Sequence, residues 1–113
     1  MSTSRTGSRF ERRAAHQDRL RGYRILGRNV WAGGNELDLI VRRGRRLVFC
    51  EVKGKRSVDF GHPLEMITPE KRRRLRRAAE TWHAAHPECR RLDCSFELVA
   101  IHGKTLERVR AEL

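Results

Sequence analysis

The sequence predicts an α/β fold in which two helices cover a mixed β-sheet. Apolar residues at helical spacing mark two segments, over residues 9–20 and 69–86. Short runs of apolar and β-branched residues, bounded by glycine-containing turns, are typical of strands. The resulting order is helix, strand, strand, strand, helix, strand, with a short extra edge strand, which is typical of an α/β arrangement.

The first part of the chain is expected to form a tail, a helix and a strand. Residues 1–8 are polar and basic, so we expect a disordered basic tail before a single domain over residues 9–113. The first helix is predicted from about Arg9 to Leu20, with Gly22 suited to its C-terminal end. Its thin apolar stripe comprises Phe10, Ala14, Ala15 and Leu20. A strand over residues 23–30 then leads to a turn at 33–35.

A hairpin with acidic residues among apolar ones follows, with strands over residues 36–41 and 47–53. Because side chains alternate along a strand, Glu51 and Lys53 are expected on the face of Leu47 and Phe49. On the first strand, we expect one face to carry Glu36, Asp38 and Ile40 and the other to carry Leu37, Leu39 and Val41.

The turn of this hairpin determines whether the acids meet. A two-residue Arg43-Gly44 turn, or a four-residue loop over residues 42–45, places Asp38 opposite Phe49. Glu51 is then a diagonal neighbour of Asp38 on the same face. A three-residue loop would place the two acids on opposite faces.

The second half begins with a clear helix start, with Thr68 as N-cap and Pro69 at the first helical position. This helix is predicted to bury Leu75, Ala78, Ala79 and Trp82 and to stop at Pro87. An irregular connection over residues 54–66 precedes it, and strands over residues 96–101 and 106–109 follow it. Trp31 and Trp82 are both expected in the core.

Asp38, Glu51 and Lys53 are residue types that suit metal-assisted chemistry on phosphate. Carboxylates are hard oxygen ligands for Mg²⁺ or Mn²⁺, and Mg²⁺ typically takes only one or two of them from protein. Lys53 can orient a water and offset charge on a phosphate. The alternative is that these three residues form an ion-pair cluster on a solvated sheet face. The apolar residues that flank them on both faces argue against this alternative.

The arrangement of Asp38, then Glu51-Val52-Lys53 on the next strand, resembles the PD-(D/E)XK nuclease superfamily, with Leu37 where that name places proline. Further motifs resemble the YraN-like family of small uncharacterised bacterial proteins along nearly the whole chain. They occupy residues 22–29, 34–40, 49–53, 56–57, 60–63 and 68–72.

This resemblance implies a restriction-endonuclease-like α/β fold, similar to archaeal Holliday junction resolvases, and a Mg²⁺-dependent endonuclease, with Mn²⁺ as an alternative ion. Asp38, Glu51 and the Val52 carbonyl would hold the metal, and Lys53 would assist the water that attacks phosphorus. DNA, including branched DNA, is the implied substrate. Resolvase-like relatives act as dimers, so a homodimer is the assembly that the resemblance suggests.

Two further acids match positions of the family. Glu11 matches a glutamate of the first helix, where related nucleases often place an acid near the metal, although a surface helix glutamate is an equal alternative. Glu36 is expected to be an outer partner of the site or a salt-bridge member. Gln17 and Asp18 stand where the family usually has an aromatic residue and a leucine, which predicts weaker packing of the first helix.

The charge of the chain points to a polyanionic partner. Its 113 residues carry 26 Lys and Arg against 14 Asp and Glu, a formal net charge of +12. The candidate nucleic-acid-binding residues are Lys55, Arg56, Lys71, Arg72, Arg73 and Arg76. A solvated helix surface is the alternative for these arginines.

Other functions stay open at this point. A non-catalytic nucleic-acid-binding accessory protein that retains the nuclease fold needs only the basic surface, and an RNA-associated protein is a third alternative. The spacing of His83, His86, Cys89 and Cys94 fits no standard zinc pattern. Three cysteines, no signal peptide and no membrane-length apolar run predict a cytoplasmic protein with reduced thiols.

Overall fold

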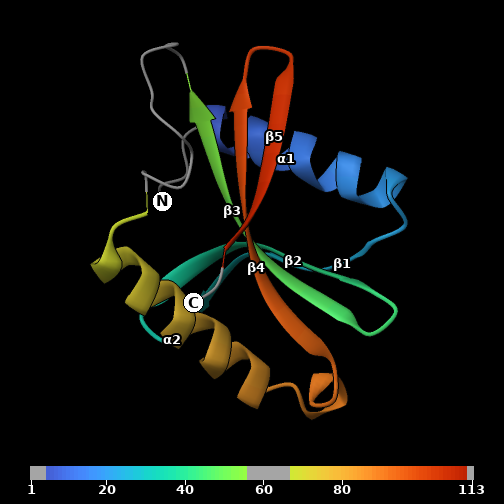
Figure 1. Ribbon diagram of the computed structural model, residues 1–113, viewed down its shortest axis with the longest axis vertical. Helices are drawn as coiled ribbons and strands as arrows, with labels where there is room; N and C mark the ends of the chain where they lie inside the picture. Colours follow the sequence, from blue (N-terminus) through green and yellow to red (C-terminus); the bar gives the residue numbers. More distant parts are fainter. Residues whose placement is uncertain (1–4, 56–66, 112–113) are drawn as a thin grey trace.

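The computed structural model describes residues 5–55 and 67–111, which form two helices, a 3₁₀ turn and five strands (Figure 1). The elements in chain order are α1 (Arg5–Leu20), β1 (Arg24–Ala32), β2 (Asn35–Arg43), β3 (Arg46–Lys55), α2 (Pro69–Ala84), η2 (Pro87–Cys89), β4 (Asp93–His102) and β5 (Thr105–Ala111). The sheet order is β1-β2-β3-β4-β5. Only the β3–β4 pair is parallel, so the sheet is mixed, and the predicted fold class and element order are confirmed.

Each face of the sheet packs against one helix. Leu47 and Phe49 of β3 contact the buried face of α2, and the rings of Phe49 and Trp82 meet edge to face at 5.8 Å. Val48 and Cys50 point the other way, into a second cluster with Ala14 and Ala15 of α1. The alternation expected along β3 is therefore confirmed, and the two helices lie on opposite sides of the sheet (Figure 1).

Helix α2 starts and ends where its sequence signals predict. The Thr68 hydroxyl accepts a hydrogen bond from the backbone N–H of Lys71 at 3.1 Å, and Pro69 occupies the first turn. Leu75, Ala78, Ala79 and Trp82 are buried, and Pro87 begins the short η2 turn beyond the helix. None of the helices described is long and apolar enough to cross a membrane.

The β2–β3 turn is one residue later than expected. Arg43 pairs with Arg46, so Gly44 and Arg45 form the turn and Ile40, instead of Asp38, lies opposite Phe49. Gly44 has a φ of 60°, and glycine at the first turn position is what a type II′ hairpin requires. The register moves by two residues, which leaves Asp38 and Glu51 on the same face.

Several side chains and boundaries differ from the prediction. Helix α1 begins at Arg5, inside the stretch expected to be a tail, and β3 runs on to Lys55, so the connection predicted from residue 54 starts later. Trp31 is 73% exposed and Leu20 is 75% exposed, so neither joins the core. Leu37 packs in the same cluster as Ile40, which contradicts the alternation expected there. Residues 1–4, which were expected to belong to a tail, and residues 56–66 lie outside the described residues.

Glu11 and Asp18 lie on the buried face of α1, and Asp18 stands where the family usually has a leucine. The Arg108 guanidinium of β5 bridges this helix to the sheet: it contacts Gln17 at 2.7 Å, Asp18 at 3.1 Å and Glu97 at 2.6 Å. Burial raises the pKa of Asp18, and Arg108 opposes that rise. The two residues that predicted weaker packing therefore take part in a polar network.

We predict that Arg108→Met lowers the free energy of unfolding by about 3–5 kcal/mol, because it leaves the buried Asp18 carboxylate without its main cation. Adding Asp18→Leu should recover the part of that loss that comes from Asp18, while Glu97 stays without its arginine partner. Urea denaturation of the two single variants and the double variant measures the coupling. Additive losses in the double variant would contradict this account.

Candidate active site

The candidate site lies where β2 and β3 separate. Their pairing ends at Leu39 and Cys50, and beyond this point β2 continues beside β1 while β3 continues beside β4 (Figure 1). A continued ladder would give the Val52 N–H a backbone partner on β2. Instead it donates to Asp38 Oδ2 at 2.9 Å, so the aspartate side chain takes the place of a ladder carbonyl.

Glu51 is a buried carboxylate with two lysine partners. Only 4% of the residue is exposed, and its Oε2 lies 3.6 Å from Lys53 Nζ and 3.3 Å from Lys71 Nζ. Lys53 reaches it along the same strand face, as alternation predicts. Lys71 comes from the first turn of α2, which the Thr68 cap holds in place.

The environment of Asp38 strongly disfavours the charged form of its side chain. Burial raises the pKa of Asp38, the nearby Glu51 carboxylate raises it further, and the result is a pKa of about 8. The hydrogen bond from Val52 opposes this shift, and Asp38 is also within hydrogen-bonding reach of Glu51. Two carboxylates that share one site and a proton favour a bound cation.

Glu11 reaches the same region from α1. It is 6% exposed, and its Oε1 has no hydrogen-bond partner among the residues described. Burial raises the pKa of Glu11, as do Glu36 and Glu51, while a hydrogen bond from Asn29 lowers it. The structure therefore places Glu11 close enough to Asp38 and Glu51 to act on their charge, and Glu36 close enough to Glu11 to do the same.

Asn29 is a site residue that the sequence prediction missed. It is the one non-glycine residue with a positive φ, 53°, in the described part of the chain. Its neighbours Arg28 and Val30 pair with Leu39 and Leu37, so Asn29 lies opposite Asp38. Asparagine tolerates this backbone region better than most residues, and its place at the end of the family-like motif over residues 22–29 was the signal that could have found it.

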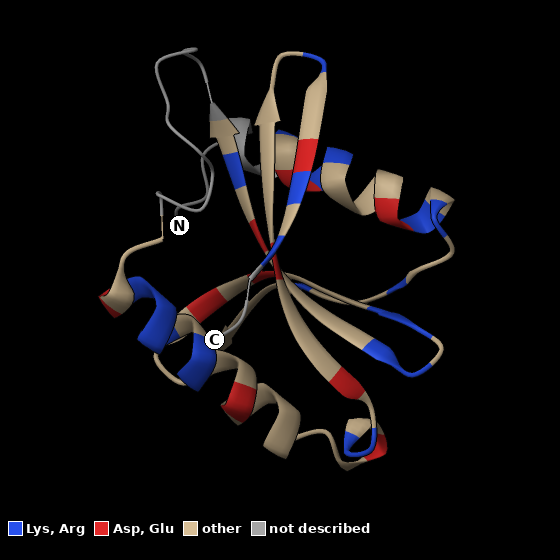
Figure 2. Ribbon diagram, in the orientation of Figure 1, with Lys and Arg blue, Asp and Glu red and all other residues tan. Residues whose placement is uncertain are grey.

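The predicted nucleic-acid contacts divide into two groups. Lys71 joins the carboxylates, whereas Arg72, Arg73 and Arg76 lie exposed along α2, whose first half is coloured mainly blue in the ribbon of Figure 2. Lys55 ends β3, and its side chain, like all of Arg56, lies outside what the structure describes. Trp31, opposite Glu36 in the β1–β2 register, adds an exposed indole near the site.

The donor set suits an ion that needs few protein ligands. In residues 5–55 and 67–111, no group of three or more His, Cys, Asp or Glu side chains is arranged to hold a metal ion. Asp38 and Glu51 supply two adjacent carboxylates, and Glu11 adds an unpartnered buried oxygen. Two carboxylates with water completing the shell are an ordinary Mg²⁺ arrangement.

The histidines and cysteines that raised the zinc alternative have other partners. His83 Nε2 lies 2.8 Å from the Cys89 carbonyl oxygen, and His86 Nδ1 lies 2.7 Å from that of Trp82. Cys50, Cys89 and Cys94 are free thiols. These contacts fit structural histidines and reduced cysteines.

The fold and the site together define a small mixed α/β protein with a carboxylate–lysine cluster at a strand separation. The chain belongs to the family described as uncharacterised protein family UPF0102, whose model matches residues 10–101. It is 39% identical over 109 residues to a UPF0102 protein of Dechloromonas aromatica, covering 96% of this chain and 88% of that relative. It is 35% identical over 111 residues to the UPF0102 protein YraN of Escherichia coli O8, covering 97% and 85%.

We predict that, without divalent ions, the protein loses stability as pH rises from about 4 to 8. Unfolded Asp38 ionises near its ordinary pKa of 3.8 while folded Asp38 keeps its proton up to about pH 8, so the unfolded state binds fewer protons in this window. Each proton corresponds to a slope of about 1.4 kcal/mol per pH unit. Asp38→Asn should flatten the slope without removing it, because burial also raises the pKa of Asp18 and Glu11.

Urea denaturation at pH 5 and pH 8 in EDTA measures this slope. The matched control is Glu107→Gln, an exposed acid on β5, which should keep the wild-type slope. An equal slope in wild type and Asp38→Asn would show that Asp38 titrates normally.

Proposed function

We propose that this protein is a divalent-metal-dependent endonuclease that hydrolyses phosphodiester bonds in DNA, with branched or otherwise structured DNA as its preferred substrate. The observation that carries the proposal is the meeting of Asp38 and Glu51 at the strand separation, with Lys53 and Lys71 on the same carboxylate. The family has no assigned activity, so the proposal depends on this geometry together with the resemblance to PD-(D/E)XK nucleases.

In the proposed reaction, a bound cation and the protein's own side chains have different roles. Asp38 and Glu51, with the Val52 carbonyl, would hold Mg²⁺ or Mn²⁺, which when bound polarises a phosphoryl oxygen and lowers the pKa of water. Asp38 must release its proton to act as a ligand, so its high pKa makes ion affinity increase up to about pH 8. Glu11, which interacts with the charges of Glu36 and Glu51, adds a further carboxylate at the edge of the cluster, which strengthens its preference for a cation.

The two lysines are suited to a substrate phosphate. The Lys53 and Lys71 ammonium groups, held at 3.6 and 3.3 Å from Glu51 Oε2, each have three N–H donors and use only some of them on Glu51. The remaining donors can bind phosphate oxygens and stabilise the charge that develops during hydrolysis. Lys53 is also placed to orient the attacking water.

Two exposed features offer binding away from the reacting bond. The arginines of α2 continue from Lys71 along the helix surface and provide phosphate contacts without base specificity. The Trp31 indole, 73% exposed, provides an aromatic face on which an unpaired base can stack. An unpaired base beside a cut site is a feature of branched DNA and supports that substrate class.

A second candidate function is the non-catalytic nucleic-acid-binding accessory protein. It is favoured by the lack, within the described residues, of a cluster of three potential ligand side chains. Calorimetric titration of Mg²⁺ or Mn²⁺ separates the two functions: Asp38-dependent ion binding supports the endonuclease, and its absence supports the accessory role.

We predict that Asp38→Asn and Lys53→Met each reduce Mg²⁺- or Mn²⁺-dependent DNA cleavage by roughly 10²-fold or more. Asparagine can still accept the Val52 hydrogen bond, and Lys71 still pairs with Glu51 in Lys53→Met, so both variants should fold and bind DNA. The assay uses linear, nicked, flapped and four-way DNA, with EDTA and Glu107→Gln as controls. Wild-type protein that binds these substrates but cuts none of them would contradict the endonuclease.

A further inference from the structure

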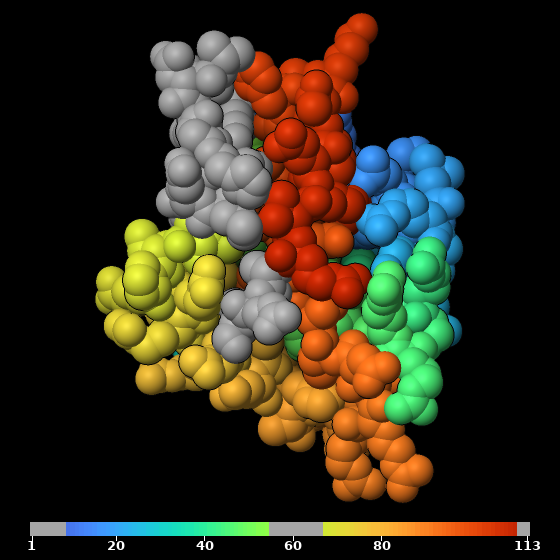
Figure 3. Space-filling model, viewed as in Figure 1, coloured from blue at the N-terminus to red at the C-terminus, as the bar shows by residue number. Residues whose placement is uncertain are grey.

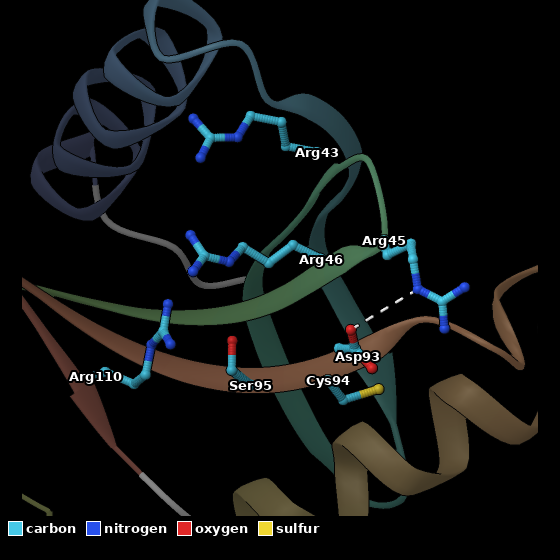
Figure 4. A pocket seen from close by; sticks show the side chains of 7 residues that line it. All are labelled: Arg43, Arg45, Arg46, Asp93, Cys94, Ser95 and Arg110. Carbon is cyan, nitrogen blue, oxygen red and sulfur yellow. Dashed lines mark ion pairs between the residues drawn. The ribbon is translucent and has the colours of Figure 1, made fainter.

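A basic pocket lies at the far end of the hairpin from the carboxylates. It has a volume of about 440 Å³ and is lined by Arg43, Arg45, Arg46, Asp93, Cys94, Ser95 and Arg110 (Figure 4). The β2–β3 turn forms one wall, and β4 and β5 form the other, as their neighbouring green, orange and red atoms show in Figure 3. At about 3.3 Å per residue, Arg43 lies roughly 16 Å along β2 from Asp38.

The pocket opens on the side of the sheet that α1 covers, opposite Lys53 and Lys71. Arg46 and Ser95 alternate with residues that face α2, and Arg46 contacts Tyr23 of the α1-side cluster at 3.4 Å. Figure 4 shows the side chains of Arg43, Arg46 and Ser95 on this side. The pocket is therefore a separate feature from the candidate active site.

The arginines that line the pocket are held in place by partners that leave their charge available. Arg43 lies over the Tyr23 ring at 4.9 Å and donates to the Arg21 carbonyl oxygen at 2.9 Å. Arg46 donates to the Tyr23 hydroxyl, and although the Glu97 charge acts on it from a distance, neither arginine forms an ion pair within residues 5–55 and 67–111. Arg45 is the exception, since its Nε lies 4.0 Å from Asp93 Oδ2. Within the described residues, Arg110 has neither a hydrogen bond nor an ion pair from its side chain.

Ser95 provides an independent sign that the pocket is built for a ligand. Its Oγ is inaccessible to solvent and has no hydrogen-bond partner in the described part of the chain. Figure 4 shows the hydroxyl directed toward the space between Arg46 and Arg110. A buried hydroxyl without a partner is unfavourable, and an acceptor atom in the pocket would satisfy it once the neighbouring arginine side chains shift to admit it.

We propose that this pocket binds a phosphate group of a nucleic-acid backbone, as a contact separate from the cleavage site. A phosphate has several acceptor oxygens, which suits donors that converge from four strands, and guanidinium groups match its geometry. Four arginines against one aspartate give the required charge. The nucleic-acid partner rests on the proposed function, whereas the phosphate pocket itself does not.

A backbone bound here would extend the nucleic-acid contact around the molecule. The pocket and the two active-site lysines lie on opposite faces of the sheet, so a straight duplex seated on the lysines would not fill the pocket as well. A second arm of a branched molecule, or a bent duplex, reaches both sites. The pocket therefore favours structured nucleic acid over a short linear duplex.

The test measures binding in EDTA, so that cleavage plays no part. Fluorescence anisotropy with a four-way DNA junction and a linear duplex is recorded over a range of salt concentrations for wild type, Arg110→Ala, Arg46→Ala and the double variant. Ser95→Ala tests the pocket without changing charge. Arg12→Ala, an exposed arginine of α1, is the charge-matched control.

We expect Arg46→Ala and Arg110→Ala each to weaken junction binding roughly 10-fold and to reduce the salt slope by about one, as loss of one phosphate contact does. Because both bind the same phosphate, the double variant should lose no more slope than either single variant. Ser95→Ala should weaken binding severalfold, and Arg12→Ala should have a clearly smaller effect.

Two results would overturn the proposal. One is that the pocket variants weaken binding no more than Arg12→Ala does. The other is that they reduce binding of inorganic phosphate, measured by calorimetry, while junction binding stays unchanged, which would assign the pocket to a small phosphate ligand. The pocket variants are also compared in the Asp38→Asn background. If they weaken junction binding there as well, the pocket proposal holds whether or not the wild-type protein cuts DNA, so its test is independent of the endonuclease proposal.

Discussion

The separation of β2 from β3 after the Leu39–Cys50 pair is the constraint on which the candidate site depends. A strand that loses its neighbour has backbone groups without partners, and the Val52 N–H obtains one from the Asp38 carboxylate. This hydrogen bond holds the Asp38 carboxylate beside Glu51. The lysines that contact Glu51 then determine how the remaining elements approach, since Lys71 belongs to α2 and Lys53 to the part of β3 beyond the separation.

The site is therefore a region of unfavourable electrostatics inside a well-packed fold. Glu51 is balanced by two ammonium groups, but Asp38 has only a neutral N–H donor and avoids charge by keeping its proton. The apolar clusters on the two faces of the sheet hold these groups together in spite of their mutual repulsion. The two neighbouring carboxylates therefore favour binding of a cation or a proton, because either one reduces the repulsion between them.

Much of this could be predicted from the sequence, because it follows from local rules. The period of side chains along β3 placed Glu51 and Lys53 together, and the Thr68-Pro69 start placed Lys71 at the first turn of α2. The register was wrong by two residues because Gly44 suits the first position of its turn, yet the parity was preserved. Leu37 and Trp31 could not be predicted, because strand separation and edge exposure depend on contacts between distant segments. The same holds for the arginine pocket, whose walls come from four strands.

Helix α1 shows how two departures from a simple pattern act together. Glu11, Ala14, Ala15 and Asp18 are all buried and recur at spacings of three and four, so they share one face of the helix. An acid lies at each end of this face: Asp18 is held by Arg108, and Glu11 lies near Glu36 and Glu51. Because a helix is rigid over two turns, the Arg108 contacts that fix the Asp18 end also fix where Glu11 lies. The polar residues at 17 and 18, which seemed to weaken the packing of α1, thus hold its other acid at the strand separation.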